Sequence, residues 1–195
     1  MSLYKKYLIG FVFLITSSSF AQSMYLENDG FGLSYNGSVA FLEDLSSLGY
    51  GFGAIINSNF DIGYVKNQVK ITRNKKYFGT KDFIVYNNTG YVNIRLGREG
   101  IDSFLTLAFS TNVYYDSYSA GINFYKKIIL FNDLDLFPTV NFDVSQISEE
   151  TFYPDFTTTG TLSFLISKLL VLSPSISFVK SDVVYGFDIS LIALF

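Results

Sequence analysis

The chain has 195 residues, of which 49% are hydrophobic, and it carries a net charge of −3. It contains no cysteine and no histidine, which excludes disulfides and thiolate metal sites and removes the commonest general base and metal ligand. The small net charge and the lack of a basic stripe argue against nucleic-acid binding, and we expect no cofactor.

The N-terminus has the pattern of a secretory signal peptide. Lys5 and Lys6 precede the apolar stretch "YLIGFVFLI" (7–15), and "SFA" (19–21) places small residues at a cleavage site. We therefore expect cleavage after residue 21 and a mature domain over 22–195. A buried N-terminal helix is the alternative, but the apolar stretch is too short to span a bilayer as a helix.

The rest of the chain shows alternation of apolar and polar residues in segments of about ten residues. In "FGLSYNGSVAF" (31–41), Phe31, Leu33 and Tyr35 fall on one face, whereas Gly32 and Ser34 fall on the other. The segments 102–113, 134–145 and 183–195 repeat this pattern. With 21 Phe and 15 Tyr, the composition also favours strands, so we predict an all-β domain.

The size of the polar-face residues separates two interpretations of this pattern. A soluble sandwich exposes a polar face that usually carries long charged side chains. Here the polar face consists mainly of Gly, Ser, Thr, Asn and Ala, which suits the interior of a narrow barrel whose apolar face contacts lipid. We favour a closed antiparallel up-and-down transmembrane β-barrel, with mid-strand lipid-facing positions free of charge. A secreted sandwich is the alternative.

The alternation predicts ten strands, an even number as in bacterial barrels. Eight strands are the alternative, because the alternation slips between Tyr64 and Val65 and weak strands could merge. The predicted strands are 30–42, 48–57, 60–71, 83–97, 102–113, 117–131, 134–147, 156–168, 170–180 and 183–195.

The connections between these strands alternate in length. Those expected outside the cell, such as 72–81 and 148–156, are mostly longer than those expected in the periplasm, such as 57–59 and 132–133. This asymmetry is typical of outer-membrane barrels, and it places both chain ends on the periplasmic side.

Charged residues of inward parity predict a polar lumen. Arg95 and Asp102 flank the turn "GREG" (97–100), and we expect them to pair directly across a hairpin as an ion pair. Asp143 and Asp188 also have inward parity. Together with Tyr91, Asn93, Asn141 and Asp143, the Arg95–Asp102 pair is expected to form a polar plug.

The most charged connection is "RNKKYFGTK" (73–81). At an outer rim its basic side chains could contact the phosphates of lipopolysaccharide. An ordinary solvated loop is the alternative. The candidate donors are Arg73, Lys75, Lys76 and Lys81.

The last predicted strand ends on an aromatic residue, and with the signal peptide and alternation it resembles small outer-membrane β-barrel proteins of Gram-negative bacteria. The resemblance implies a monomer surrounded by outer-membrane lipid and lipopolysaccharide. It also implies a signal for the barrel-assembly machinery in the last strand. The matching positions are Tyr185, Phe187, Ile189, Leu191 and Phe195.

The enzymatic barrels of this superfamily, such as omptin-like proteases, the outer-membrane phospholipase and the lipid palmitoyl transferase, rely on histidine, which this chain lacks. We therefore expect a non-enzymatic barrel that is structural or acts through its outer loops. A carboxylate site at Glu149, Glu150 and Asp155, or a Ser167–Lys168 site, is the catalytic alternative. A small passive channel is the alternative function. Ten strands enclose little more than a side-chain-filled interior, but the inward Gly and Ser residues leave more room than bulky residues would.

Overall fold

The structure is a computed structural model that describes residues 22–25, 30–42, 45–57, 59–75, 79–97, 101–114, 116–147, 154–179 and 182–195. The predicted signal peptide lies outside these residues. A short 3-10 helix, η1 (Gln22–Tyr25), precedes the strands. Within the described residues, no helix is long and apolar enough to cross a membrane.

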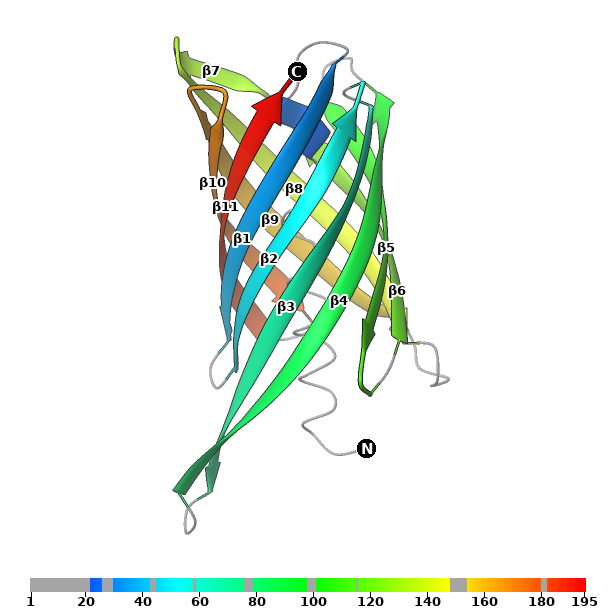
Figure 1. Cartoon of the computed structure of the whole chain (residues 1–195), viewed down its shortest axis with the longest axis vertical. Coiled ribbons are helices and arrows are strands. Elements are labelled where there is room, and N and C mark those ends of the chain that lie inside the picture. Colours follow the sequence, from blue (N-terminus) through cyan, green and yellow to red (C-terminus); the bar gives the residue numbers. More distant parts are fainter. Residues whose placement is uncertain are drawn as a thin grey trace.

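The strands follow one another as antiparallel neighbours around a closed barrel (Figure 1). Their bounds are β1 (Phe31–Leu42), β2 (Leu45–Ile56), β3 (Phe60–Lys75), β4 (Gly79–Gly97), β5 (Asp102–Asn112), β6 (Asp116–Tyr125), β7 (Ile128–Phe131), β8 (Leu134–Ile147), β9 (Asp155–Ile166), β10 (Leu170–Val179) and β11 (Asp182–Leu194).

Two pairings close the sheet. β1 pairs with β11, and β6 pairs with β8, so ten strands form the wall and the prediction of a closed ten-stranded barrel is confirmed. The additional strand β7 pairs only with β8. Closure satisfies the backbone groups of every wall strand on both sides, which a bilayer requires.

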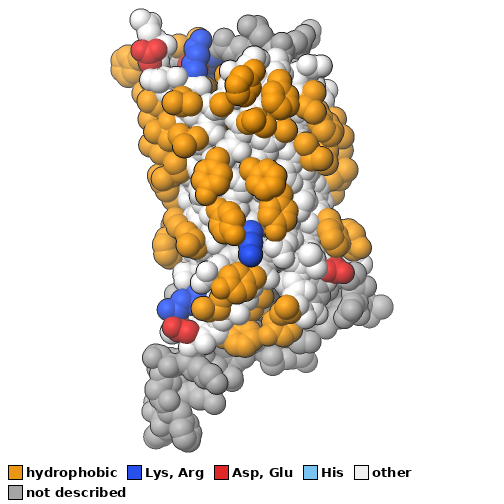
Figure 2. Space-filling model, in the orientation of Figure 1, with side chains coloured by type: hydrophobic (Ala, Val, Ile, Leu, Met, Phe, Trp, Pro, Cys, Tyr) orange, Lys and Arg blue, Asp and Glu red, His pale blue; other side chains and the backbone are white. Residues whose placement is uncertain are grey.

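The division of the strands into an outer and an inner face follows the alternation of the sequence. On β1, Phe31, Leu33 and Tyr35 point outward and are 44%, 47% and 57% exposed, whereas Ser34 and Asn36 are buried inside. Hydrophobic side chains cover the outer surface in the view of Figure 2. The slip expected at Tyr64 and Val65 does not occur, because Val65 is simply an apolar residue that faces the lumen.

The two ends of the barrel differ. At the η1 end lie η1, the start of β1 and the last residues of β11. At the opposite end, which we call the hairpin end, β3 and β4 pair with each other beyond the last β2–β3 pair at Leu45 and Ile71. The resulting hairpin projects from the wall (Figure 1).

One predicted strand and the predicted difference in loop length are wrong. The segment 117–131 is not one strand, because it breaks at Lys126 and Lys127. Beyond Tyr125 it has lost its β5 neighbour and pairs with β8 alone. The predicted difference in loop length is also largely absent, because most residues of the expected loops 43–47 and 72–81 extend strands instead.

Candidate functional site

The lumen is the candidate site, because the polar side chains of the wall converge there. An apolar layer lies at its η1 end. Tyr25 of η1 packs edge-on against Phe137, with ring centroids 5.0 Å apart, and Phe104 stacks on Tyr125 at 5.6 Å. The layer consists of Tyr25, Ile55, Phe104, Tyr125, Phe137, Leu165, Val171 and Ile192, all buried.

Arg95 lies beside this apolar layer, directly opposite Phe104. Its Nη2 atom is 3.0 Å from Asp102 Oδ2 and donates a 2.5 Å hydrogen bond to the Tyr125 hydroxyl. Its guanidinium also lies over the Phe104 ring, 5.5 Å from the centroid. The side chains of Arg95 and Asp102 are only 10% and 21% exposed, so the pair is shielded from water.

The predicted ion pair is present, but the predicted strand register is wrong. Arg95 lies directly opposite Phe104 rather than Asp102, in a register that is constant from Asn87 to Arg95, and an irregularity follows between Arg95 and Gly97. The length and flexibility of the arginine side chain allow it to reach Asp102 from this position.

A polar layer occupies the middle of the lumen. Thr106 donates to the Asn93 side-chain oxygen and accepts from Asn123, both at 2.7 Å. Asn93 also donates to Asp61 at 3.4 Å, while Asn141 donates to Asp143. This network joins β3, β4, β5 and β6, and its hydrogen bonds offset the cost of burying amides and carboxylates.

Hydroxyl groups line the wall formed by β9 and β10. Thr159 and Ser177 lie 2.8 Å apart, and Ser173 donates to Ser163 at 2.9 Å. The latter two hydroxyls also interact with the hydroxyl of Tyr25. The short helix is therefore attached to the lumen by polar as well as aromatic contacts.

Glycines make room for the larger inward side chains. A Cβ atom at Gly63 would overlap the Tyr91 ring, which also covers Gly53. A Cβ at Gly121 would overlap the carboxylate of Asp143 directly opposite it. The small inward residues noted in the sequence thus accommodate other side chains, as expected in a narrow barrel.

A second apolar cluster lies towards the hairpin end, on the side of the lumen formed by β1 to β4, β10 and β11. It contains Ala40, Leu45, Val69, Val85, Val179 and Val184. The polar layer therefore lies between apolar side chains on this side of the barrel.

The predicted lumen residues face inward from several strands. Asp143 and Asp188 are 7% and 3% exposed. They belong to β8 and β11, which β9 and β10 separate in the sheet. Tyr91, Asn93 and Asn141 are buried as well.

The predicted assembly positions Tyr185, Phe187, Ile189 and Leu191 form an exposed outward row on β11. The strand ends at Leu194, one residue earlier than predicted. The backbone N–H of Phe195 still donates to the Phe31 carbonyl at 2.8 Å, and its side chain is 78% exposed. These residues lie at the seam where β11 joins β1.

Of the predicted lipopolysaccharide contacts, Arg73 and Lys75 belong to β3 and Lys81 to β4, with Arg73 opposite Lys81 in the projecting hairpin. Lys76 lies outside the described residues, as do Glu149 and Glu150. Asp155 begins β9. Ser167 and Lys168 form an exposed left-handed turn with φ of 51° and 56°.

Metal-ligating side chains are dispersed. In the described ranges, no group of three or more His, Cys, Asp or Glu side chains could hold a metal ion. The charged residues of the lumen instead take part in hydrogen bonds and ion pairs with other protein groups, as Arg95 and Asp102 do.

No protein-family model matches the chain, and no curated protein is similar to it in sequence. Among solved structures, LpxR from Salmonella typhimurium has a TM-score of 0.52 and 9% identity, with 85% of each chain covered. The KdgM porin has a TM-score of 0.49 and 8% identity over 81% of this chain and 98% of its own.

The translocator domain of the autotransporter NalP from Neisseria meningitidis has a TM-score of 0.44 and 8% identity over 85% of this chain and 88% of its own. At such identities the likeness concerns the fold alone, which is that of small outer-membrane β-barrel proteins. This fold by itself does not distinguish an enzyme from a non-enzymatic barrel.

Proposed function

We propose that this protein is a non-enzymatic barrel of the bacterial outer membrane, exported by the segment 1–21, whose lumen is closed. The observation that carries this proposal is the apolar layer at the η1 end, where Tyr25 packs on Phe137 inside the wall. Such a layer excludes water, and with it hydrated ions, from one end of the lumen.

The fit of side chains in the middle of the lumen supports the same function. Tyr91 covers Gly53 and Gly63, and Asp143 occupies the space beside Gly121. Barrels of this size enclose little more than their own side chains, whereas open aqueous pores need about sixteen strands. A closed barrel acts on its surroundings through its outer wall and its exposed ends.

We place the hairpin end on the outside of the cell. Arg73, Lys75 and Lys81 then belong to a hairpin on the outer side, near the phosphates of lipopolysaccharide, and Lys76 is part of the same basic stretch of sequence. Electrostatic attraction between these basic residues and an anionic surface supports a role in binding or organising the outer leaflet.

A small passive channel is the second candidate function. Inward hydroxyls alternate along β9 and β10, from Thr157 to Ser163 and from Ser173 to Ser177. If η1 left the lumen, this polar wall would border a narrow path. The channel therefore requires that Tyr25 leave its place against Phe137, whereas the closed barrel requires that Tyr25 remain packed there.

Conductance of the mature chain in planar bilayers tests the closed barrel. We expect no steady conductance from residues 22–195. Tyr25→Ala, which removes the ring packed on Phe137, should give brief, small openings, and Tyr35→Ala on the outer face is the matched control. A large, steady conductance from the unmodified protein would instead support the channel.

The location is tested separately. The mature protein should fractionate with outer membranes and migrate as a compact band that shifts when the sample is boiled. Recovery as a soluble periplasmic monomer would contradict the proposed location.

A further inference from the structure

The outward face of β3 changes from apolar to polar along its length. Phe60 and Ile62 point outward near the η1 end, whereas Lys66, Gln68 and Lys70 occupy the outward positions towards the hairpin end. This contradicts the expectation that mid-strand lipid-facing positions are uncharged. A lysine on this face is destabilising unless its ammonium group reaches a polar region or a ligand.

The surroundings of Lys66 form a polar site in an otherwise apolar wall. Its Nζ atom lies 5.5 Å from the centroid of the Tyr86 ring. On the neighbouring strand, Asn88 lies opposite Lys66 and accepts a 2.6 Å hydrogen bond from the Tyr64 hydroxyl. Among the described residues, no carboxylate forms an ion pair with Lys66. Its charge is therefore available to an anion.

A second cation, Lys70, lies two outward positions further along β3, beyond Gln68. Lys70 is on the same face of β3, 45% exposed, and its ammonium is 2.8 Å from Asp82. The pair marks the point where the hairpin leaves the wall. Lys66 lies about 10 Å deeper along the barrel axis, given the rise and tilt of barrel strands. The long side chain of Lys66 can cover much of that depth.

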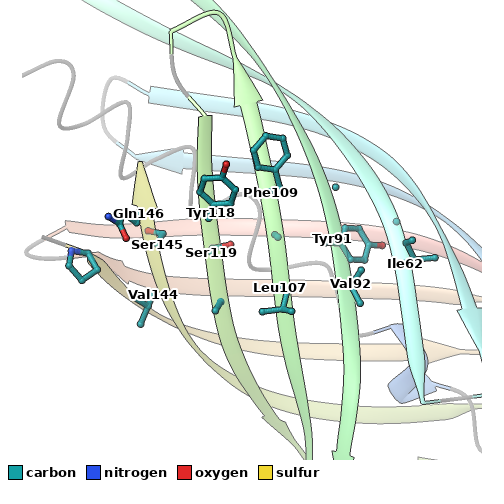
Figure 3. A pocket seen from close by; sticks show the side chains of 15 residues that line it. Ile62, Tyr91, Val92, Leu107, Phe109, Tyr118, Ser119, Val144, Ser145 and Gln146 are labelled. Atoms are coloured by element: carbon teal, nitrogen blue, oxygen red, sulfur yellow. The ribbon is translucent and has the colours of Figure 1, made fainter. Parts of the chain in front are cut away.

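An apolar groove begins beside this polar site. Gly90 lies opposite Tyr64 and, on the other side, opposite Phe109. A Cβ atom there would meet nothing within 4 Å. A groove of about 730 Å³ at this point crosses β3, β4, β5, β6 and β8 (Figure 3). Its outward lining includes Ile62, Val92, Leu107, Phe109, Tyr118 and Val144.

We propose that the outer wall of β3 to β6 binds one phosphorylated membrane lipid at a defined site. The phosphoryl headgroup accepts charge-assisted hydrogen bonds from Lys66 and Lys70, and an acyl chain descends past Tyr64 into the groove at Gly90. The positive charge of the site and the adjacent apolar groove fit the two ends of such a lipid. This inference rests on the proposed membrane location, and it extends the anionic contact of the hairpin into the wall.

Lipid retention by the purified barrel tests the proposal. The mature protein is folded in mixed micelles of phosphatidylglycerol and phosphatidylcholine, and retained lipids are counted by native mass spectrometry. We expect one phosphatidylglycerol per barrel. Lys66→Ala with Lys70→Ala should weaken its retention about tenfold, the loss of roughly one strong charged contact. Lys126→Ala, an exposed lysine at the η1 end, is the matched control and should change nothing.

A second variant tests the groove without changing charge. Gly90→Phe places a ring in open space, so the barrel should fold normally and yet retain several-fold less lipid. Competition by millimolar inorganic phosphate alone would overturn the assignment to a lipid. Equal retention by wild type and the lysine variant, or an equal loss in Lys126→Ala, would overturn the site. A barrel that conducts ions but retains the lipid would contradict the closed-barrel function only.

Discussion

The apolar and polar layers of the lumen are assembled in different ways. The apolar layer joins residues near the ends of seven strands with Tyr25, so it depends on closure of the whole barrel and on the position of η1. The polar layer consists largely of contacts between neighbouring strands, as in the link from Asn93 through Thr106 to Asn123. The apolar layer therefore forms only when the wall is complete, whereas the polar layer holds pairs of neighbouring strands together.

The first prediction concerns the loss of one ring from the apolar layer. Phe137→Ala removes a ring that is 1% exposed and packs against Tyr25 and Tyr125. We expect a loss of about 3–5 kcal/mol in the free energy of unfolding, because a cavity forms in a layer that cannot readily collapse. Circular dichroism during denaturant unfolding measures the change, since the chain has no tryptophan.

The matched control for this change lies on the same strand. Phe142 points outward and is 52% exposed, so Phe142→Ala removes a similar ring from the lipid face. It should destabilise the barrel much less than Phe137→Ala. Equal losses would mean that the layer inside the lumen is not a specific source of stability.

These apolar inward residues mark the limit of what the sequence predicts. Because parity depends only on the backbone, alternation identifies all ten wall strands. Several predicted ends are wrong by three or four residues, and 117–131 runs past the end of β6. Alternation also predicts the inward direction of Asp143 and Asp188. However, Phe104 and Phe137 interrupt the small polar face, and the alternation offers no reason for large rings inside a narrow barrel. That reason is Tyr25, whose position depends on long-range packing.

The site proposed on the outer wall could not be predicted from the sequence, for a similar reason. Lys66 and Lys70 have outward parity in the sequence. That they could bind an anion becomes apparent only when their neighbours on β4, Tyr86 and Asn88, are known. The register of β3 with β4 could not be fixed from the sequence, because residues of the expected loop 72–81 extend both strands.

The second prediction concerns the ion pair beside the apolar layer. Arg95→Ala leaves the carboxylate of Asp102 and the hydroxyl of Tyr125 in a poorly hydrated place. We expect a loss of about 2–3 kcal/mol, less than for a fully buried pair because both side chains retain some exposure. A double-mutant cycle with Asp102→Asn measures the coupling. Strictly additive losses would show that the two residues do not stabilise each other.

The third prediction concerns a neutral contact of the polar layer. Thr106→Val keeps the shape of the side chain but removes the hydroxyl that joins Asn93 to Asn123. We expect a loss of about 1–2 kcal/mol, since two buried amide groups each lose a partner. Thr111→Val, at a half-buried outward position of the same strand, is the control. A loss no greater than in this control would contradict a stabilising polar layer.

The smallest effect is expected where a polar contact lies outside the wall, at Lys70 and Asp82. Their side chains are 45% and 46% exposed, so water and salt screen the pair and Asp82→Asn should leave the unfolding midpoint at neutral pH almost unchanged.

A hydrogen bond from the Lys70 ammonium nevertheless lowers the pKa of the Asp82 carboxyl, with further help from Thr72. Because the pKa is lowered in the folded state, any stabilisation is present above the ordinary carboxyl range and is lost as the pH falls through the lowered value. Titration of the Asp82 carboxyl by NMR should show this shift, and Lys70→Ala should abolish most of it. An ordinary pKa in the wild type would mean that even this contact is absent in solution, and that polar contacts matter only where the barrel excludes water.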